Sequence, residues 1–241
     1  LHSFPTRRSS DLEIKIYNWC LTLPQEFADA RDYKAETTIE LDTSIELPKN
    51  FSLGEWIYTT NYQWQYGSCT SNATSHWMQV LNVKARWRKP VSNNIITPNW
   101  KDLWTKMWHD LSNVDDSGDY VEKAVSTALK EWIANEEWWI STYDWYATAN
   151  WTTDDKWIEK IKRYIYNWNP VVWVISGNSI TWNELSKWEL KTFIEVWHRS
   201  WAHCVACVGW DEWGLRFVNS WRTNDWKWLK SRFYVSNNFL K

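Results

Sequence analysis

Tryptophan in this chain often stands where a reversal of the backbone usually requires glycine. The 241 residues include 25 Trp and only 6 Gly, whereas an average composition of about 7% Gly would give roughly 17. Asn-Gly and Asp-Gly are strong turn dipeptides. Here, six tryptophans directly follow Asn or Asp: Trp19, Trp100, Trp145, Trp151, Trp168 and Trp226. Such a sequence has few residues that adopt positive φ at low cost, and this restricts how its helices can end and its strands can turn.

Two interpretations of this imbalance remain open. In the first, glycine codons have been read as tryptophan, because some bacterial lineages translate UGA as glycine. Five tryptophans should then be exposed, crowded or at positive φ: Trp19, Trp64, Trp87, Trp145 and Trp168. In the second, the protein is genuinely rich in Trp and uses indole rings to bind carbohydrate. We favour the first, because stacking platforms for sugars have no preference for turn positions.

Charge, hydropathy and cysteine content exclude several classes of protein. A net charge of −2 provides no basic surface of the kind that binds nucleic acid. No apolar run approaches the ~20 residues that span a bilayer, so no membrane association is expected. The four cysteines are too few and too unevenly spaced for a disulfide framework: Cys20, Cys69, Cys204 and Cys207. Reduced thiols are therefore expected, and they favour a cytoplasmic setting.

The chain divides into three parts. Residues 1–12, LHSFPTRRSSDL, resemble translated adaptor sequence and are excluded from the fold. Residues 13–45 are expected to form an N-terminal extension, and residues 46–241 a single domain with a substantial core.

Apolar spacing predicts helices first and strands later. From Thr70, apolar residues recur at helical intervals, with Ser68 or Thr70 as the N-cap. Further amphipathic helices are predicted at 119–134 and 152–166. Apolar runs predict strands at 170–176, 203–210, 215–221 and 231–236. The fold class is therefore α+β, with a helical N-terminal half and a β-rich C-terminal half.

Cys69 lies where a reactive thiol is expected, at the start of the first predicted helix. A helix N-terminus stabilises a thiolate, a nearby His exchanges its proton, and a third group orients the imidazole. His203 opens an apolar strand, and the following strand ends at Asn219. If these strands pair as a hairpin, the imidazole and the amide can face one site. By itself, a Cys at a helix start is more often a small buried apolar residue.

Other candidate residues carry less information. Four histidines lie in the excluded tail or have no apparent partner: His2, His76, His109 and His198. Cys204 and Cys207 have the spacing of zinc and redox sites, but residues three apart on a strand point to opposite faces. No second Cys or His pair with metal-ligand spacing accompanies them, so no metal is expected.

Three local motifs resemble those of the papain-like cysteine peptidases. QWQYGSC at 63–69 is similar to the family's Gln-Gly-x-x-Gly-Ser-Cys. HCVACVGW at 203–210 is similar to its His-Ala-Val-x-x-Val-Gly-Tyr, and NSW at 219–221 matches its Asn-Ser-Trp. The order of the motifs along the chain is that of the family.

The separations also resemble those of the family. His203 and Asn219 follow Cys69 by 134 and 150 residues, and about 130–150 is typical. ELPKNFSLGE at 46–55 is similar to the opening of the mature enzyme, so the resemblance covers about Glu46 to Lys241.

The resemblance implies a two-lobed papain-like fold and a cysteine-type peptidase of the C1 type. It implies that Cys69 is the nucleophile and that His203 is the general base and acid. Asn219 would accept the second N–H of His203, and Gln63 would donate its amide to the oxyanion beside the Cys69 N–H.

The resemblance also implies how substrate is bound. A stretch near Gly118 would pair with the substrate backbone, and Trp221 would shield the His–Asn pair from water. The implied partner is a peptide or protein substrate. The resemblance implies no cofactor, and it implies that the enzyme is a monomer.

Some residues depart from the family pattern. Trp64 stands at a family glycine, Tyr66 replaces a disulfide cysteine, and Arg222 replaces the glycine after Asn-Ser-Trp. Two binding functions therefore stay open beside the enzyme: an inactive papain-like protein and a Trp-rich carbohydrate binder. The presence of all four catalytic-type residues together favours the enzyme.

Overall fold

The structure is a computed structural model, and parts of the chain are described in it. These are residues 17–18, 20–21, 33–34, 42–57, 61–63, 66–86, 98–113, 118–131, 133–134, 140–141, 147–148, 157–186, 189–190, 201–220 and 232–236. Several residues singled out in the sequence lie outside these ranges: Trp19, Trp64, Trp87, Trp145, His198 and Trp221.

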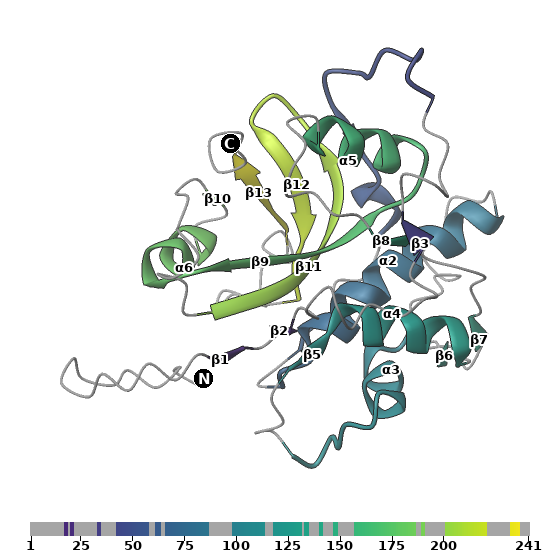
Figure 1. Cartoon of the computed structure of the whole chain (residues 1–241), viewed down its shortest axis with the longest axis vertical. Helices are drawn as coiled ribbons and strands as arrows, with labels where there is room; N and C mark the ends of the chain where they lie inside the picture. Colours follow the sequence, from purple (N-terminus) through teal and green to yellow (C-terminus); the bar gives the residue numbers. More distant parts are fainter. Residues whose placement is uncertain are drawn as a thin grey trace.

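Three helices form one half of the molecule, and two more lie beside the sheet of the other half (Figure 1). The first group is α2 (Cys69–Arg86), α3 (Trp100–Lys106) and α4 (Val121–Lys130). The second is α5 (Trp157–Tyr166) and α6 (Ser179–Ser186), and η2 (Gly54–Trp56) is a short 3-10 helix. Among the described helices, none combines the length and the hydropathy that a membrane crossing requires.

The other half is built on a seven-stranded sheet around β11 (Trp201–Trp210). β11 pairs antiparallel with β9 (Val171–Gly177) and β12 (Gly214–Val218), and β12 pairs antiparallel with β13 (Arg232–Ser236). The remaining strands are β4 (Phe51–Ser52), antiparallel to β11, β1 (Tyr17–Asn18), parallel to β11, and β10 (Glu189–Leu190), parallel to β13.

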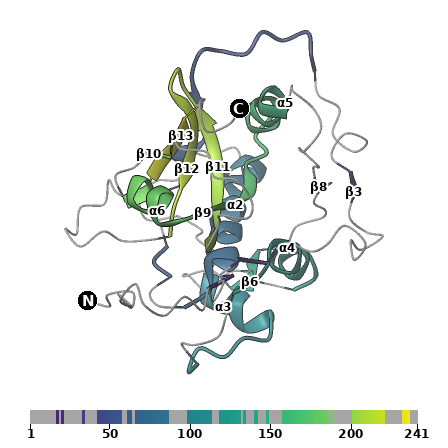
Figure 2. The same cartoon turned by 60° about the vertical axis from the view of Figure 1, so that its left-hand side comes forward.

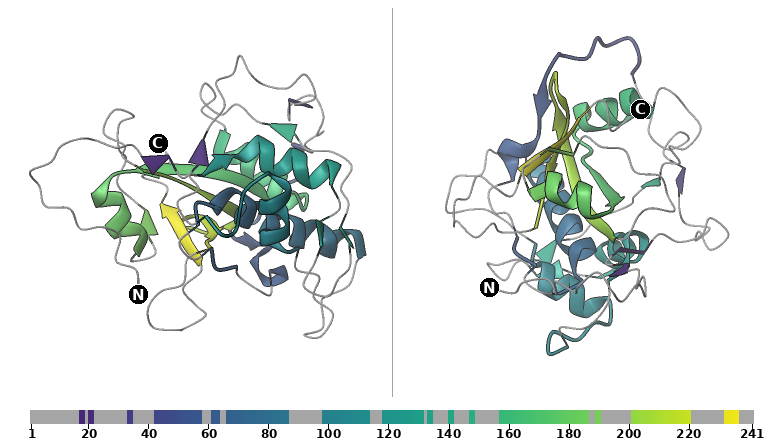
Figure 3. Two further views of the ribbon diagram at one scale, coloured as in Figure 1. Left: turned by 90° about the horizontal axis from the view of Figure 1, so that it is seen from below. Right: turned by 90° about the vertical axis from the view of Figure 1, so that its left-hand side faces the viewer.

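Three pairs of two-residue strands lie outside this sheet. They join β2 (Cys20–Leu21) to β5 (Asp119–Tyr120), β3 (Tyr33–Lys34) to β8 (Ala147–Thr148), and β6 (Ile133–Ala134) to β7 (Ile140–Ser141). In the right-hand view of Figure 3, the long strands lie in the upper part of the molecule and α3 at its lower end.

The sheet half is held together by apolar side chains. Residues 203–210 of β11 are all buried, which agrees with an apolar run that lacks alternation. Phe217 and Phe233 stack with ring centroids 5.3 Å apart, and Ile161 and Ile165 of α5 belong to the same core. Gly209 allows the close approach of β4, because a Cβ there would lie 2.4 Å from the Phe51 carbonyl oxygen.

Helix α2 lies alongside β11 and also contacts α3 and α4 (Figures 1 and 2). Residues 67–80 are buried throughout, although eight of these fourteen residues are polar. The apolar positions predicted for this helix are buried, and its polar positions are buried as well, because the helix is covered on several sides. Two of its serines donate to backbone carbonyls: Ser71 Oγ to Ser68 at 3.0 Å, and Ser75 Oγ to Pro98 at 2.5 Å.

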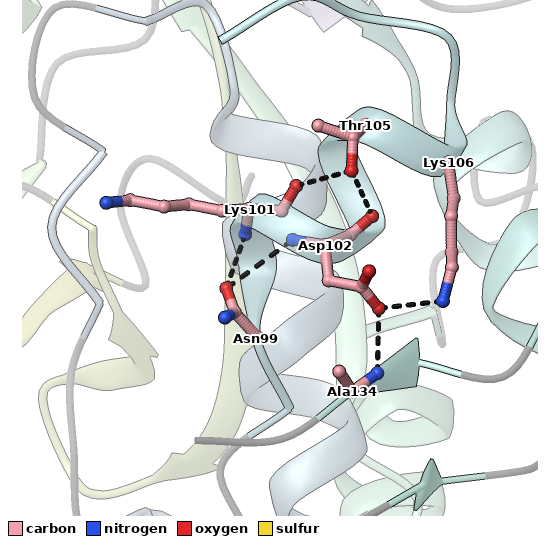
Figure 4. Close-up of polar contacts among 6 residues, drawn as sticks. All are labelled: Asn99, Lys101, Asp102, Thr105, Lys106 and Ala134. Carbon is pink, nitrogen blue, oxygen red and sulfur yellow. Dashed lines mark hydrogen bonds and ion pairs between the residues drawn. The ribbon is translucent and has the colours of Figure 1, made fainter. Parts of the chain in front are cut away.

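Helix α3 is fixed at its start by a side-chain cap. The Asn99 amide oxygen accepts hydrogen bonds from the Lys101 and Asp102 backbone N–H groups, which otherwise lack an intrahelical partner (Figure 4). Asp102 in turn binds Lys106 at 2.8 Å and the Ala134 N–H at 2.7 Å. This carboxylate ties β6 to the helix.

The ends of α3 and α5 share one backbone geometry, and each has a tryptophan in the left-handed region. Trp108 has φ 69° and Trp168 has φ 63°, and they are the non-glycine residues with positive φ in the described part of the chain. After α5, the Trp168 N–H bonds to the Ile165 carbonyl and the Asn169 N–H to the Tyr164 carbonyl. This bond pair is the Schellman motif, whose left-handed position is usually glycine.

The end of α3 repeats the pattern. The Trp108 N–H bonds to the Thr105 carbonyl, and the His109 N–H to the Trp104 carbonyl. The glycine-like backbone predicted for Trp168 is thus confirmed, and Trp108 is a second case that turn dipeptides did not reveal. Trp19, Trp64, Trp87 and Trp145 lie outside the described residues.

One predicted helix is shorter than expected, and two observed helices were not predicted. The helix expected at 119–134 is shorter, because Asp119–Tyr120 and Ile133–Ala134 are paired as strands β5 and β6. α3 and α6 were not predicted, because each is too short for its apolar residues to form a recognisable helical repeat. The long strands β9, β11, β12 and β13 match the predicted runs to within a few residues.

Candidate active site

Cys69 is the first residue of α2 and is completely buried. Its neighbours form a small cluster with Ala73 of the same helix and Cys204 of β11, against which Ala202 packs. Ala202 and Cys204 are the residues on either side of His203. The cluster therefore brings the start of the helix to the part of the strand that carries the predicted base.

His203 and Asn219 meet across the β11–β12 pair. Ala206 of β11 lies opposite Val218 of β12, so the end of β12 returns alongside the start of β11. His203 Nε2 lies 2.7 Å from Asn219 Oδ1, and the two residues are 1% and 2% exposed.

The surroundings of Asn219 identify the donor in this contact. Asn219 Oδ1 also accepts the Ser220 backbone N–H at 2.8 Å. An atom that accepts from a backbone N–H is the amide oxygen, so His203 must contribute the hydrogen. The contact therefore holds His203 in a form with hydrogen on Nε2.

Gln63 belongs to the same network through Ser220. Its backbone N–H donates to the Ser220 carbonyl at 3.0 Å, and its Oε1 accepts from Ser220 Oγ at 2.5 Å. Its Nε2 donates one hydrogen to the Tyr66 carbonyl at 3.0 Å. Ser220 thus orients the Gln63 amide, with Oε1 toward Ser220 and Nε2 away from it. The Asn-Ser-Trp motif alone did not predict this role for its serine.

Tyr66 stands where the family resemblance implies a cysteine, and it makes two contacts of another kind. Its hydroxyl donates to the Leu111 carbonyl at 2.8 Å, and its ring lies 6.1 Å from that of Trp100. The segment before Cys69 is therefore anchored to the region after α3.

Gly118 is buried and directly precedes β5. The next residue, Asp119, is held by three donors: His109 Nε2 at 2.7 Å, Lys123 Nζ at 2.6 Å and the Tyr120 backbone N–H at 2.7 Å. Burial raises the pKa of Asp119, but the hydrogen bonds from His109 and Lys123 outweigh it, and the pKa is lowered overall. The His109 ring also stacks on the Trp104 ring, with the ring centroids 3.5 Å apart.

Two histidines without an apparent partner in the sequence are therefore partnered in the structure. His109 binds Asp119, and His76 Nε2 accepts the Asn61 backbone N–H at 3.0 Å. No sequence signal could have shown either contact, because the partners are 10 and 15 residues away without helical or strand periodicity.

The remaining cysteines of β11 are parts of the core. Cys204 and Cys207 are buried free thiols, and burial raises the pKa of Cys207 well above its usual range. Within the described residues, no group of three or more His, Cys, Asp or Glu side chains is arranged to hold a metal ion.

Two short segments near the start of the chain pair with strands that carry or adjoin the predicted site residues. Tyr17–Asn18 pairs with Trp201–Ala202, immediately before His203, and Cys20–Leu21 pairs with Asp119–Tyr120, immediately after Gly118. The strand edges next to both residues therefore accept an extended chain. Trp221 lies outside the described residues.

Known structures of cysteine proteases share the fold of this chain. Xylellain from Xylella fastidiosa matches with a TM-score of 0.64 at 16% identity, over 91% of this chain and 90% of that one. Procathepsin B S9 from Trypanosoma congolense matches with a TM-score of 0.60 at 14% identity, over 94% of this chain and 84% of that one.

The Carica candamarcensis cysteine protease CMS1MS2, in complex with E-64, matches with a TM-score of 0.53 at 12% identity, over 79% of this chain and 89% of that one. The chain has the papain-like fold. No protein-family model matches the sequence, and no curated protein matches it at a significant level. Because the identities are this low, the papain-like fold is shown here by shape alone.

Proposed function

We propose that the protein is a C1-type cysteine peptidase with Cys69, His203, Asn219 and Gln63 as its catalytic residues. The observation that carries this proposal is the buried hydrogen bond from His203 Nε2 to Asn219 Oδ1, on a strand that packs against the start of the Cys69 helix. Residues 46–241 would form the peptidase domain, in two lobes that correspond to the helical half and the sheet half.

The first chemical step is acylation of the thiol. Since Nε2 of His203 is held by Asn219, Nδ1 is the nitrogen that takes the Cys69 proton. The thiolate attacks the scissile carbonyl carbon, a C–S bond forms, and the carbonyl electron pair moves to the oxygen. The Cys69 backbone N–H and the Gln63 Nε2 amide would donate to that oxyanion.

The tetrahedral species then breaks down to a thioester. The C–N bond breaks, and the leaving amine takes the proton from His203. A water molecule next attacks the thioester and gives a proton to the same imidazole. The C–S bond breaks, the acid leaves, and Cys69 regains its proton. No external oxidant or cofactor takes part in this sequence of steps.

Substrate binding would use the strand edges beside the site. Because Cys20–Leu21 pairs with Asp119–Tyr120, that edge has backbone groups able to bind a peptide or protein substrate near Gly118. Trp221 would cover the His203–Asn219 pair. A substrate on this edge must displace residues 20–21, so deletion of residues 1–21 should lower KM.

The test is hydrolysis of a panel of fluorogenic peptides by the full chain. Cys69→Ala should abolish turnover with the fold intact, whereas Cys204→Ala, a buried cysteine in the same cluster, should retain it. Asn219→Ala should keep reduced activity, about 10- to 100-fold below the parent, because it orients the base rather than supplying the nucleophile. Full activity in Cys69→Ala would end the peptidase proposal.

We further propose that residues 108 and 168 are glycines in the natural protein, encoded by UGA in a bacterium that reads this codon as glycine. Both occupy the left-handed position of a Schellman motif, where a Cβ costs about 1–2 kcal/mol. The same substitutions elsewhere would account for the absence of a matching family model. Mass spectrometry of the protein from its source cells distinguishes Gly from Trp at both positions, and UGG codons there would refute the proposal.

A further inference from the structure

Besides His203 of β11, a second buried imidazole lies near this site: His76 of α2, on the same side of the helix as Cys69. His76 lies seven residues after Cys69, and residues seven apart share a helix face. His76 is completely buried, and its Nε2 accepts the backbone N–H of Asn61 at 3.0 Å. Asn61 is itself only 8% exposed, so water cannot easily replace this acceptor.

The direction of this hydrogen bond determines the form of the imidazole. A backbone N–H can only donate, so Nε2 of His76 must carry no hydrogen. The same ring nitrogen has opposite roles in the two buried histidines, since Nε2 donates in His203 and accepts in His76.

The segment from Asn61 to Gln63 is therefore held from two sides. On the helix side, His76 holds Asn61; on the sheet side, Ser220 holds the backbone and the side chain of Gln63. Gln63 is two residues from Asn61, and Cys69 is on the same rigid helix as His76. The two contacts together set the position of the Gln63 amide relative to Cys69.

We propose that His76 is a positioning residue for the oxyanion site, acting through Asn61 on Gln63. This inference rests on the proposed function, in which Gln63 donates to the oxyanion. Small displacements matter there, since a donor misplaced by about 1 Å can cost on the order of 100-fold in rate. Loss of the acceptor should therefore lower kcat and leave KM nearly unchanged, because the donor acts on the transition state.

The test compares two substitutions of His76 in the full chain. His76→Leu removes the acceptor at similar size and should lower kcat at least about 10-fold, with KM within about twofold. His76→Gln can place an amide oxygen near Nε2 and should recover most of kcat. The alkylation rate of Cys69 by iodoacetamide should stay close to that of the parent in both, because alkylation does not use the oxyanion site.

A matched control comes from the neighbouring residue. Ser75→Ala removes another buried hydrogen bond from α2, to the Pro98 carbonyl, away from the Gln63 segment. It should lower thermal stability without changing kcat. An equal loss of kcat in Ser75→Ala and His76→Leu would overturn the proposal, because both losses would then come from general loosening of the helix.

A double-substitution cycle with Gln63→Ala separates this inference from the proposed function. If His76 acts through Gln63, His76→Leu should have little further effect on kcat in the Gln63→Ala background. Full additivity would overturn the role of His76 while leaving the peptidase intact. Unchanged kcat in Gln63→Ala alone would instead overturn the oxyanion role of Gln63.

Discussion

The central helix and the central strand of this molecule are equally buried but differ in chemistry. β11 is covered on both faces and is mainly apolar from His203 to Trp210. α2 is covered on several sides and keeps polar side chains inside, and two of these, Ser71 and Ser75, donate to the Ser68 and Pro98 carbonyls. Non-directional burial thus dominates around β11, whereas α2 adds directional hydrogen bonds to the apolar cluster that it shares with α3 and α4.

α2 and β11 meet where Cys69 packs against Cys204. Because one thiol begins a helix and the other lies inside a strand, we expect the two cysteines to differ in reactivity. Cys69 sits at a helix start, where the dipole favours a thiolate, whereas Cys204 and Cys207 lie inside the strand. At pH 6 we expect an iodoacetamide-type electrophile to label Cys69 at least about 100-fold faster than either strand cysteine. Peptide mapping after timed quenching measures the three rates. Comparable labelling of all three thiols would remove the distinction.

Deletion of a core side chain should affect the two halves to different extents. Phe217→Ala removes a buried ring stacked on Phe233 and should lower the free energy of unfolding by about 3–5 kcal/mol. Ser71→Ala in α2 removes a buried hydroxyl that donates to the Ser68 carbonyl and should cost about 1 kcal/mol. Denaturant titration of both variants, with tryptophan fluorescence as the signal, gives the comparison. A larger loss for Ser71→Ala would reverse our account of the two halves.

Directional contacts in the helical half should also depend on pH. The folded-state pKa of Asp119 is depressed below the ordinary 3.8, so its stabilising contribution is present above that value and is lost as the pH falls through the folded pKa. Asp119→Asn should therefore cost about 2 kcal/mol at pH 7, and the difference from the parent should shrink below about pH 4. Unfolding free energies of both proteins from pH 7 to pH 2.5 measure this.

Asp110 supplies the control for that prediction. Its pKa is also lowered, by hydrogen bonds from Ser112, but its carboxylate is exposed to solvent. Asp110→Asn should change stability little at any pH. A constant difference between Asp119→Asn and the parent across the pH range would show that the contact acts through packing rather than charge.

Patterns along the sequence predicted the parts of this fold that local chemistry determines. The apolar runs located β9, β11 and β12, and the start of α2 at Cys69 followed from the polar turn before it. The spacing of His203 and Asn219 indicated one site because the intervening residues form a hairpin. In these cases, the information lies within a few residues of the element.

Contacts between distant segments could not be predicted in the same way. Ser220 binds Gln63 across 157 residues, and neither residue has a periodic pattern that points to the other. His76 and His109 each bind partners in irregular segments, where no register relates the two positions. Tryptophan at the ends of α3 and α5 added a further difficulty, because glycine is the residue that normally marks a helix stop.

The smallest predicted effect compares one tryptophan from each half. Trp108 ends α3 in the helical half and is 93% exposed, whereas Trp168 ends α5 beside the sheet and lies 5.1 Å from the Trp56 ring. Both side chains sit on a left-handed backbone, but only Trp168 gains packing there. Trp108→Gly should raise the free energy of unfolding by about 1 kcal/mol, and Trp168→Gly by less, since it also loses its aromatic contact.

Trp213 separates backbone strain from the simple removal of an indole. It is 62% exposed but is not among the residues with positive φ. Trp213→Gly should leave stability unchanged or lower it by up to about 1 kcal/mol, because glycine increases the entropy of the unfolded chain. If thermal and denaturant unfolding show the same gain for Trp213→Gly as for Trp108→Gly, the gain comes from deletion of an exposed ring. A gain confined to Trp108 and Trp168 would show that the helix ends themselves require glycine.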